Sequence, residues 1–436
     1  MKVAIIGSGI SGLAVAHGLQ PHADVTLLEA NDYFGGHTHT VDITVDDKGR
    51  PVTMAVDTGF LVLNERTYPN LLQLFSELNV DIAKSDMSFS VQVPKPDGGE
   101  GLEWSGNNLS TVFVQRRNMV NPKFLGMLQD LLRFNSLCTE LAVAGKDEAL
   151  QQPLADFLSQ HKFGTPFREW YFLPMLGCIW SCPTDQMLQF PVATMIRFCH
   201  NHGLLQVNNR PQWYTVRGGA RHYVNAIVSR LADARLNSPV SLIERHANGV
   251  WVHTPNGPEQ FDQVVIATHT DQALRMLDHP SAMEDNVLGQ IGYQQNLAVL
   301  HTDASLLPKR RAAWASWNYE RATDDTQEHQ RVCLHYWLNQ LQPLPTDVPV
   351  VETLNPIRPI DPSKVLATFE YSHPVFDLKA IKAQALVPLL QGQNRTWYAG
   401  AWTGYGFHED GLKSGLAVVQ GLMNKLGQKA SLKEAA

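Results

Sequence analysis

The hydrophobic pattern of the first thirty residues predicts a strand, a helix and a second strand. Residues 2–6 form a short, apolar and mostly β-branched run, which is typical of a buried strand. Residues 13–19 carry apolar side chains at helical spacing, and residues 25–28 form a second apolar run that ends at Glu29. We therefore expect a β–α–β unit at the beginning of the chain.

The loop inside this unit has the glycine spacing of a dinucleotide-binding turn. Residues 7–12 have the sequence GSGISG, the G-x-G-x-x-G pattern, in which Gly7 permits a tight turn, Gly9 admits a pyrophosphate and Gly12 permits close helix packing. Glu29 follows where a carboxylate can accept hydrogen bonds from ribose hydroxyls. Dinucleotide binding is the favoured interpretation, and a glycine-rich turn without a cofactor is the alternative. The predicted contacts are Gly7, Gly9, Ser11, Gly12, Glu29 and Ala30.

A second strand–loop–helix pattern lies near the end of the chain. Residues 396–400 predict a strand that leads into a glycine-rich turn, and a helix is expected from about residue 412 to 426. The N-terminus of that helix can stabilise negative charge. Between the two ends, residues 263–268 predict one more buried strand, so both ends of the chain are expected to build one domain.

Two long insertions separate these blocks. Residues 122–142 and 154–160 have the apolar spacing of amphipathic helices. Aromatic residues gather in both insertions, and an aromatic-lined cavity suits an apolar substrate, although core packing is the alternative for any single ring. The clusters contain Phe167, Trp170, Tyr171, Phe172 and Trp180, and then Trp314, Trp317, Tyr319, Tyr336 and Trp337.

Composition excludes several classes of protein. Of the 436 residues, 44% are hydrophobic and 18% are charged, which excludes an intrinsically disordered chain. The 35 basic and 42 acidic residues give a net charge of −7, which argues against a nucleic-acid partner. The 5 cysteines are few and irregularly spaced, which indicates free thiols in a reducing, cytoplasmic compartment. We expect no transmembrane segment, since the sequence has no apolar run of about 18 residues.

Further motifs resemble the flavin-containing amine oxidase and phytoene desaturase superfamily. They are the Gly35-Gly36-His37 turn after Glu29, the sequence DTGF at 57–60 and the sequence GFHEDGLKSG at 406–415. The resemblance implies non-covalent FAD, because no cysteine lies in the last motif. The contacts it implies are Gly35, Gly36, His37, Thr58, Gly59, Val240, Thr268, Gly400, Gly406, Glu409, Asp410, Gly411 and Leu412.

Two positions depart from the superfamily pattern. His37 stands where relatives usually carry an arginine, so a guanidinium–phosphate contact is lost. Ala401 stands where they usually carry an acid. No second G-x-G-x-x-G unit is present for NAD(P)H, so we expect the substrate to reduce the flavin and dioxygen or another acceptor to reoxidise it.

The implied fold is α/β. A Rossmann-like FAD-binding domain is expected from residues 1–80, 211–285 and 386–436. An inserted α+β substrate domain is expected from residues 81–210 and 286–385.

Local sequences at 178–181, 201–205, 314–319 and 336–342 narrow the resemblance. They are similar to a bacterial branch of FAD/NAD-binding proteins associated with lipid methyltransferases of the cyclopropane-fatty-acid type. That resemblance implies a fatty-acyl substrate, a methyltransferase partner and peripheral contact with the inner membrane. Arg116-Arg117 or Lys309-Arg310-Arg311 would then meet anionic headgroups. An ordinary amine oxidase and a non-catalytic flavin-binding partner are the alternatives.

Four residues are candidates for the chemistry. Phe407 aligns with a tyrosine of the amine oxidase cage, and Tyr371 and His373 are expected on the opposite wall. His408 and His373 are the best base candidates because imidazole titrates near neutrality, and a structural role is the alternative for each. The short pairs Cys178/Cys182, His200/His202 and His37/His39 lack the spacing of a structural zinc site, so no metal is predicted.

Overall fold

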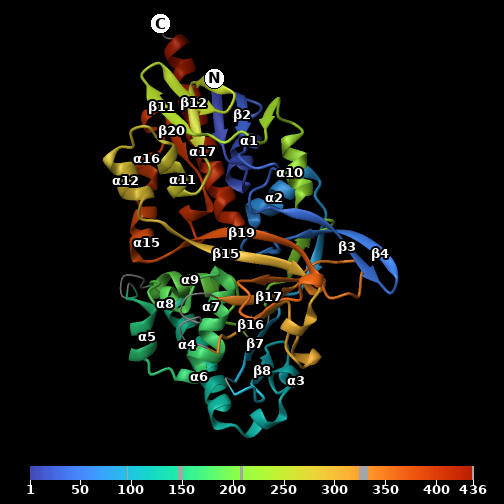
Figure 1. The fold of residues 1–436 in the computed structure, drawn as a ribbon. Coiled ribbons are helices and arrows are strands. Elements are labelled where there is room, and N and C mark those ends of the chain that lie inside the picture. Colours follow the sequence, from blue (N-terminus) through green and yellow to red (C-terminus); the bar gives the residue numbers. More distant parts are fainter. Residues whose placement is uncertain (96, 146–149, 151, 207–209, 324–331, 435–436) are drawn as a thin grey trace.

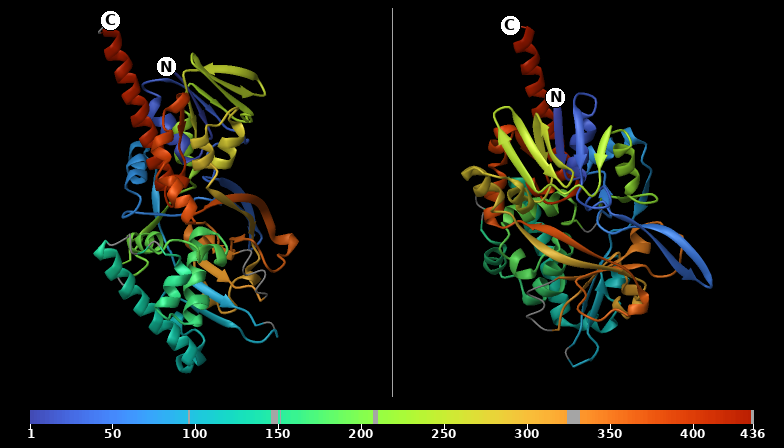
Figure 2. Two further views of the ribbon diagram at one scale, coloured as in Figure 1. Left: turned by 90° about the vertical axis from the view of Figure 1, so that its left-hand side faces the viewer. Right: turned by 45° about the horizontal axis from the view of Figure 1, so that its top comes forward.

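The computed structural model describes residues 1–436 except 96, 146–149, 151, 207–209, 324–331 and 435–436. Its chain forms two lobes, one around a parallel sheet and one around a larger mixed sheet (Figure 1). The two termini lie at the same end of the molecule, where the last helix projects beyond the parallel sheet (Figure 2). Among the described helices, none combines the length and the hydropathy that crossing a membrane would require.

The parallel sheet contains segments from the beginning, the middle and the end of the chain. Its strand order is β10-β2-β1-β14-β20, and each neighbouring pair is parallel. The central strands are buried on both faces, which explains why their sequences are continuously apolar rather than alternating. The strands are β1 (Lys2–Ile6), β2 (Asp24–Leu28), β10 (Asp233–Arg235), β14 (Gln263–Ile266) and β20 (Thr396–Tyr398). The α/β prediction and the predicted strands are confirmed.

Helices cover both faces of this sheet. One face packs against α1 (Ile10–Leu19), α2 (Pro69–Leu78), α10 (Arg221–Val228) and α17 (His408–Glu434). The other face packs against α11 (Thr270–Met276), α12 (Ala282–Leu288), α15 (Leu378–Gln384) and α16 (Val387–Leu390). A small antiparallel sheet of β11 (Leu242–His246), β12 (Gly249–Thr254) and β13 (Gly257–Phe261) lies on that side too.

Helix α17 begins four residues earlier than the sequence pattern predicted. Its first turn contains Glu409 and Asp410, and acidic side chains are favourable at a helix N-terminus because of the helix dipole. Two glycines let α17 approach α1 closely: a Cβ at Gly411 would lie 2.7 Å from Ile10 Cγ2, and one at Gly415 would lie 2.6 Å from the Ser11 carbonyl oxygen. This packing fixes the position of the loop that precedes α17.

The second lobe is built on a seven-stranded mixed sheet of order β19-β15-β18-β17-β16-β7-β8. Its longest pair, β15 (Gly292–His301) and β19 (Val365–Val375), is antiparallel and crosses the molecule between the two lobes (Figure 1). The other strands are β7 (Phe89–Val93), β8 (Leu102–Ser105), β16 (Trp317–Glu320), β17 (Cys333–Trp337) and β18 (Val351–Leu354).

Helices of the second lobe pack beside this sheet around a core rich in aromatic residues. The predicted amphipathic helices are confirmed as α4 (Pro122–Ala144) and α5 (Leu154–Gln160). The others are α3 (Leu109–Val112), α6 (Thr165–Phe167), α7 (Leu173–Trp180), α8 (Thr184–Met187), α9 (Val192–Asn201) and α14 (Leu338–Leu341).

Two small sheets complete the fold. The hairpin of β3 (Thr40–Asp47) and β4 (Arg50–Asp57) projects from the side of the molecule (Figures 1 and 2). A three-stranded sheet contains β5 (Leu63–Asn64), β9 (Trp213–Val216) and β6 (Ile82–Ser85).

Candidate active site

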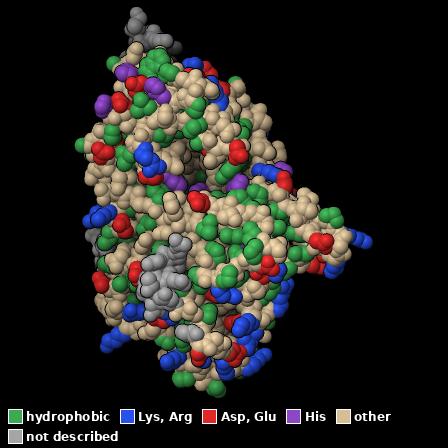
Figure 3. Space-filling view, in the orientation of Figure 1, with side chains coloured by type: hydrophobic (Ala, Val, Ile, Leu, Met, Phe, Trp, Pro, Cys, Tyr) green, Lys and Arg blue, Asp and Glu red, His purple; other side chains and the backbone are tan. Residues whose placement is uncertain are grey.

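A cavity of about 790 Å³ is lined by residues from both lobes. Figure 3 shows a hollow on this face of the molecule with histidine side chains beside it. One end of the cavity contains the glycine-rich turn, and we call this the phosphate end, lined by residues 6–11, 28–31, 35–37, 238–241 and 267–268. The other end, the aromatic end, is lined by Met87, Ile179, Trp180, Phe198, Leu204, Trp213, Trp317, Tyr336 and Phe407.

The glycines of the phosphate end have distinct structural roles. Gly7 has φ +96°, and a Cβ there would lie 2.7 Å from the Ala267 carbonyl oxygen. A Cβ at Gly12 would lie 1.9 Å from the Gly7 carbonyl oxygen, so this position admits only glycine. Around Gly9, by contrast, a Cβ would meet nothing within 4 Å, and no side chain caps the helix that begins there. This open helix N-terminus fits a pyrophosphate.

Glu29 is held rigidly beside the turn. Its carboxylate accepts hydrogen bonds from the Ser8 main-chain N–H at 2.9 Å, the Ser8 hydroxyl at 2.5 Å and the Asn31 N–H at 3.0 Å. Glu29 and Ala30 line the cavity, as does Val240, which precedes strand β11. The role of Ser8 as the partner of the acid was missed from the sequence, although it occupies a variable position of the motif.

The Gly35-Gly36-His37 turn closes against the glycine loop. A Cβ at Gly36 would lie 3.1 Å from Gly9 Cα, and the Gly35 N–H donates to the Ser8 hydroxyl at 3.0 Å. Gly35, Gly36 and His37 all line the cavity, together with Ser11, Gly59, Thr268, Gly400 and Gly406. The structure therefore brings most of the predicted cofactor contacts to one cavity.

Several predicted contacts support the cavity without lining it. Glu409 accepts hydrogen bonds from Asn70 N–H at 3.1 Å and Leu71 N–H at 3.0 Å, so it caps helix α2. Asp410 accepts from the N–H groups of Tyr405 and Phe407 at 3.0 and 3.1 Å and holds the preceding loop. These side chains turn away because α17 begins at His408. Gly12, Thr58, Gly411 and Leu412 also lie outside the lining.

His408 lines the cavity, and its ring face and Nε2 contact neighbouring side chains. The imidazole stacks on Phe60 with ring centroids 3.8 Å apart. Its Nε2 lies 2.8 Å from the Thr38 hydroxyl and 3.2 Å from the Tyr223 hydroxyl. Burial lowers the pKa of His408 to about 3, so the ring is neutral at physiological pH.

A chain of amides fixes the hydrogen bonding of His373. Asn355 Oδ1 accepts from the Leu297 N–H at 2.9 Å, so the Asn355 side-chain nitrogen donates to Asn296 Oδ1 at 2.7 Å. Asn296 must then donate to His373 Nδ1, which lies 2.9 Å away. Burial lowers the pKa of His373 to about 4. Neutral His373 therefore carries its proton on Nε2, which makes it a hydrogen-bond donor and disfavours its expected role as a base.

Aromatic rings form the walls of the aromatic end. Phe407 stacks on Phe198 with centroids 5.0 Å apart, and Trp180 lies 4.7 Å from the same phenylalanine. Tyr371, on β19, lines the cavity and its hydroxyl lies 2.7 Å from the Thr58 hydroxyl. Phe198, Met87 and Trp213 were missed from the sequence, because nothing local distinguishes them from core residues.

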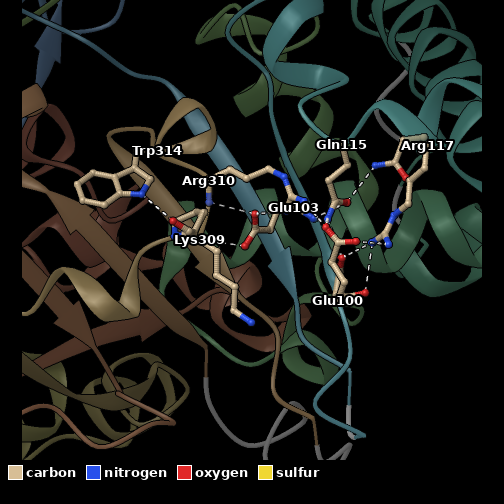
Figure 4. A network of polar contacts seen from close by, with 10 residues as sticks. Glu100, Glu103, Gln115, Arg117, Lys309, Arg310 and Trp314 are labelled. Atoms are coloured by element: carbon tan, nitrogen blue, oxygen red, sulfur yellow. Dashed lines mark hydrogen bonds and ion pairs between the residues drawn. The ribbon is translucent and has the colours of Figure 1, made fainter.

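The basic clusters predicted to meet lipid headgroups lie outside this cavity. Arg117 binds the Glu100 carboxylate at 2.5 Å, and Arg310 binds both Glu100 and Glu103 (Figure 4). Arg311 stacks on Trp314, 3.8 Å from the ring centroid. These guanidinium groups already have partners, so a contact with anionic headgroups stays a prediction that depends on exposed residues such as Arg116.

One buried group of potential metal ligands occurs among the described residues, formed by Glu320, Cys333 and His335. The Arg358 guanidinium binds the Glu320 carboxylate at 2.6 Å, and His335 binds the same carboxylate at 2.9 Å. A cation therefore already neutralises this carboxylate.

Comparison with known proteins identifies the family. The family model described as flavin containing amine oxidoreductase matches residues 10–302, more than half of the chain. The chain belongs to the flavin-containing amine oxidoreductase family. The predicted superfamily, FAD and oxidoreductase class are thereby confirmed, and the glycine-rich turn, Glu29 and the open N-terminus of α1 are the residues that fit the dinucleotide.

Individual relatives of this flavin-containing family are distant. A protein of Mycobacterium tuberculosis named as a flavin-containing monoamine oxidase is 26% identical over 277 residues, which cover 61% of this chain and 56% of that relative. The match thus spans little more than half of the relative's length. A fatty acid isomerase from P. acnes has a similar fold, with a TM-score of 0.64, 18% identity and coverage of 96% and 97%. A putrescine oxidase bound to putrescine gives a TM-score of 0.68, 14% identity and coverage of 97% and 99%.

Proposed function

We propose that this protein is an FAD-dependent oxidoreductase that desaturates or otherwise oxidises an apolar, fatty-acyl substrate. When bound, FAD would supply N5 as the acceptor of a hydride from a substrate C–H bond, which oxidises the substrate by two electrons with loss of a proton.

The observation that carries this proposal is the chemistry of the aromatic end. Its walls are aromatic or aliphatic, and the described residues that line the whole cavity include no lysine and only two acids, Glu29 and Glu370. Glu29 is bound by Ser8 at the phosphate end, and Glu370 is an exposed residue of β19. The described residues that line the aromatic end include no carboxylate to pair with a cationic substrate, whereas an alkyl chain would gain about 0.8 kcal/mol per buried CH₂.

Neutral polar groups accompany the apolar walls. His202, His373 and His408 line the cavity, and burial lowers the pKa of each, to about 4, about 4 and about 3. They remain uncharged at neutral pH, so they can orient a substrate by hydrogen bonds without a net charge in an apolar site. His373 offers its Nε2–H as a fixed donor, which suits a carbonyl or another neutral acceptor on the substrate.

An amine oxidase is the second candidate, and two observations favour it. The curated relative from M. tuberculosis is named as a monoamine oxidase, and the stacked rings of Phe198 and Phe407 could guide an amine by their π faces. The fold alone does not distinguish the candidates, since a fatty acid isomerase and a putrescine oxidase both adopt it.

Anaerobic mixing of the FAD-loaded protein with candidate substrates tests this proposal. We expect bleaching of the flavin absorbance by free fatty acids or phospholipids, with a new double bond or oxygenated chain detected by mass spectrometry. Bleaching by monoamines or polyamines and not by acyl compounds would replace the proposal by the second candidate. NADH and NADPH serve as controls, and rapid bleaching by either without substrate would contradict reduction by the substrate itself.

A further inference from the structure

The described lining of the cavity offers little positive charge to an anionic cofactor. Its one arginine or lysine is Arg275, and this guanidinium already binds Asp271 at 2.8 Å. The FAD pyrophosphate carries negative charge into a partly buried site, where an uncompensated charge is costly. The N-terminus of α1 supplies only a partial positive charge. The remaining basic groups of the lining are the histidines, among them His37.

His37 lies against the glycine loop. Its neighbour Gly36 approaches Gly9 so closely that a Cβ would lie 3.1 Å from Gly9 Cα, and the His37 carbonyl oxygen would lie 2.1 Å from a Cβ at Gly59. The main chain at His37 is therefore held against the glycine loop on one side and Gly59 on the other, close to the predicted pyrophosphate position. This is the position at which the sequence departs from the arginine usual in the superfamily.

The imidazole of His37 has an unsatisfied polar atom. Its Nε2 is buried and has no hydrogen-bond partner, although His37 lines the cavity. A buried nitrogen without a partner costs free energy, and in native proteins such an atom usually meets a ligand or water. A hydrogen bond between the ring and the main chain of Ser372 favours the protonated form of His37.

The groups that face His37 are all basic or neutral. His373 and Tyr371 on β19 have ring centroids 5.4 and 5.3 Å away, and His269, before α11, lies 6.0 Å away. His408 on α17 is more remote and also acts to keep His37 neutral. Burial and these histidines hold the pKa of His37 well below its usual value, and no carboxylate acts in the opposite direction. An incoming phosphate would supply that missing negative charge.

We propose that FAD binding protonates His37, and that its Nε2–H then donates a hydrogen bond to the pyrophosphate in place of an arginine. The proton comes from solvent and no covalent bond of the cofactor changes. This inference rests on FAD as the cofactor and is independent of the identity of the substrate.

Calorimetry of the apoprotein tests the inference. FAD is titrated between pH 6 and 8.5 in two buffers of different ionisation enthalpy, so that the difference in heat gives the number of protons bound. We expect uptake of about one proton per FAD within part of this range, and therefore a Kd that rises by up to about tenfold per pH unit there.

Three variants assign the proton. His37→Arg keeps a permanent positive charge, so it should bind FAD without proton uptake and with a Kd that does not depend on pH. His37→Gln keeps a donor but no charge, so it should bind more weakly, also without uptake. His22→Gln replaces an exposed histidine outside the cavity lining, so it is the control and should retain the uptake.

Two results would overturn the inference. One is a wild-type protein that binds FAD without taking up a proton at any pH in the range. The other is His37→Gln with undiminished uptake, which would place the proton elsewhere. If His37→Gln binds no FAD, circular dichroism verifies its fold and the His37→Arg variant decides, because failure of arginine to restore binding would also contradict the inference.

Discussion

The two ends of the cavity are built in different ways. The phosphate end is made of main chain: Gly7 adopts φ +96°, Gly12 contacts the Gly7 carbonyl oxygen, and Ser8 holds Glu29, all within the first β–α–β unit. The aromatic end is made of side chains from distant segments, such as Trp180, Phe198 and Phe407. A site made of main chain restricts single positions severely, whereas a wall of side chains can change one residue at a time. The difference explains how one family keeps its cofactor while its members act on different compounds.

The largest effect is expected at the phosphate end. Gly9→Asp places a carboxylate in open space, so the apoprotein should fold normally while the pyrophosphate is repelled and FAD binding is lost. Flavin absorbance of the purified protein and its thermal melting curve measure the two effects. Gly126→Asp on α4 is the control, because its Cβ also meets nothing within 4 Å. A yellow Gly9→Asp protein would contradict the assignment of the phosphate end.

The next largest effect is expected at the aromatic end, on substrate binding and not on FAD binding. Phe198→Ala and Phe407→Ala remove one ring of the stacked pair, which should raise the KM for an acyl substrate roughly tenfold, corresponding to about 1.4 kcal/mol of lost contact. The Kd for FAD should stay nearly constant. Steady-state kinetics and a flavin titration measure both quantities, with the exposed Leu109→Ala as control. Unchanged kinetics in both variants would contradict a role of the aromatic end in substrate binding.

A smaller effect is expected at Glu409, where it distinguishes a residue that supports the fold from one that contacts FAD. Glu409→Gln weakens the acceptor that caps α2 at Asn70 and Leu71, so the free energy of unfolding should fall by about 1–3 kcal/mol. FAD affinity of the folded protein should change little, because Glu409 does not line the cavity. Urea unfolding measures the stability, and Glu77→Gln, with its half-exposed carboxylate, is the control. A Glu409→Gln protein with full stability but without FAD binding would contradict this supporting role and indicate that Glu409 contacts FAD directly.

The smallest effect is expected in the pH dependence of the free energy of unfolding. The pKa of His408 is about 3 in the folded protein and 6.5 in the unfolded chain, so the unfolded chain binds an additional proton between these values. Stability therefore falls as pH falls from 6.5, by at most about 1.4 kcal/mol per pH unit for one proton. We expect a shallower acid loss in the apoprotein of His408→Gln, measured by urea unfolding between pH 7 and 5. Identical pH slopes for wild type and variant would contradict the neutral, buried state of His408.

The sequence predicted the parallel sheet and the phosphate end because both depend on local patterns. The buried strands are continuous apolar runs, and the G-x-G-x-x-G spacing states which main-chain positions must approach a ligand. The direction of the side chains in the motif at 406–415 could not be predicted in the same way. Its residues are adjacent in sequence, but α17 begins at His408 and directs Glu409 and Asp410 toward α2 and the preceding loop instead of the cavity.

The aromatic end could not be predicted residue by residue. Phe198 lies on a helix whose apolar spacing is that of any buried helix, and only the packing of α9 against the loop before α17 makes it a cavity wall. The same applies to the tautomer of His373, which depends on two asparagines from separate strands and loops. Such features arise from contacts between distant segments, which a local pattern does not encode.

A crystal structure of the FAD-loaded protein with a long-chain fatty acid tests the central claim most directly. We predict the pyrophosphate against the main chain of residues 7–11 and beside His37, with the alkyl chain packed against the stacked rings of Phe198 and Phe407 at the aromatic end. A pyrophosphate bound away from the glycine loop, or an alkyl chain bound outside the aromatic end, would contradict the account.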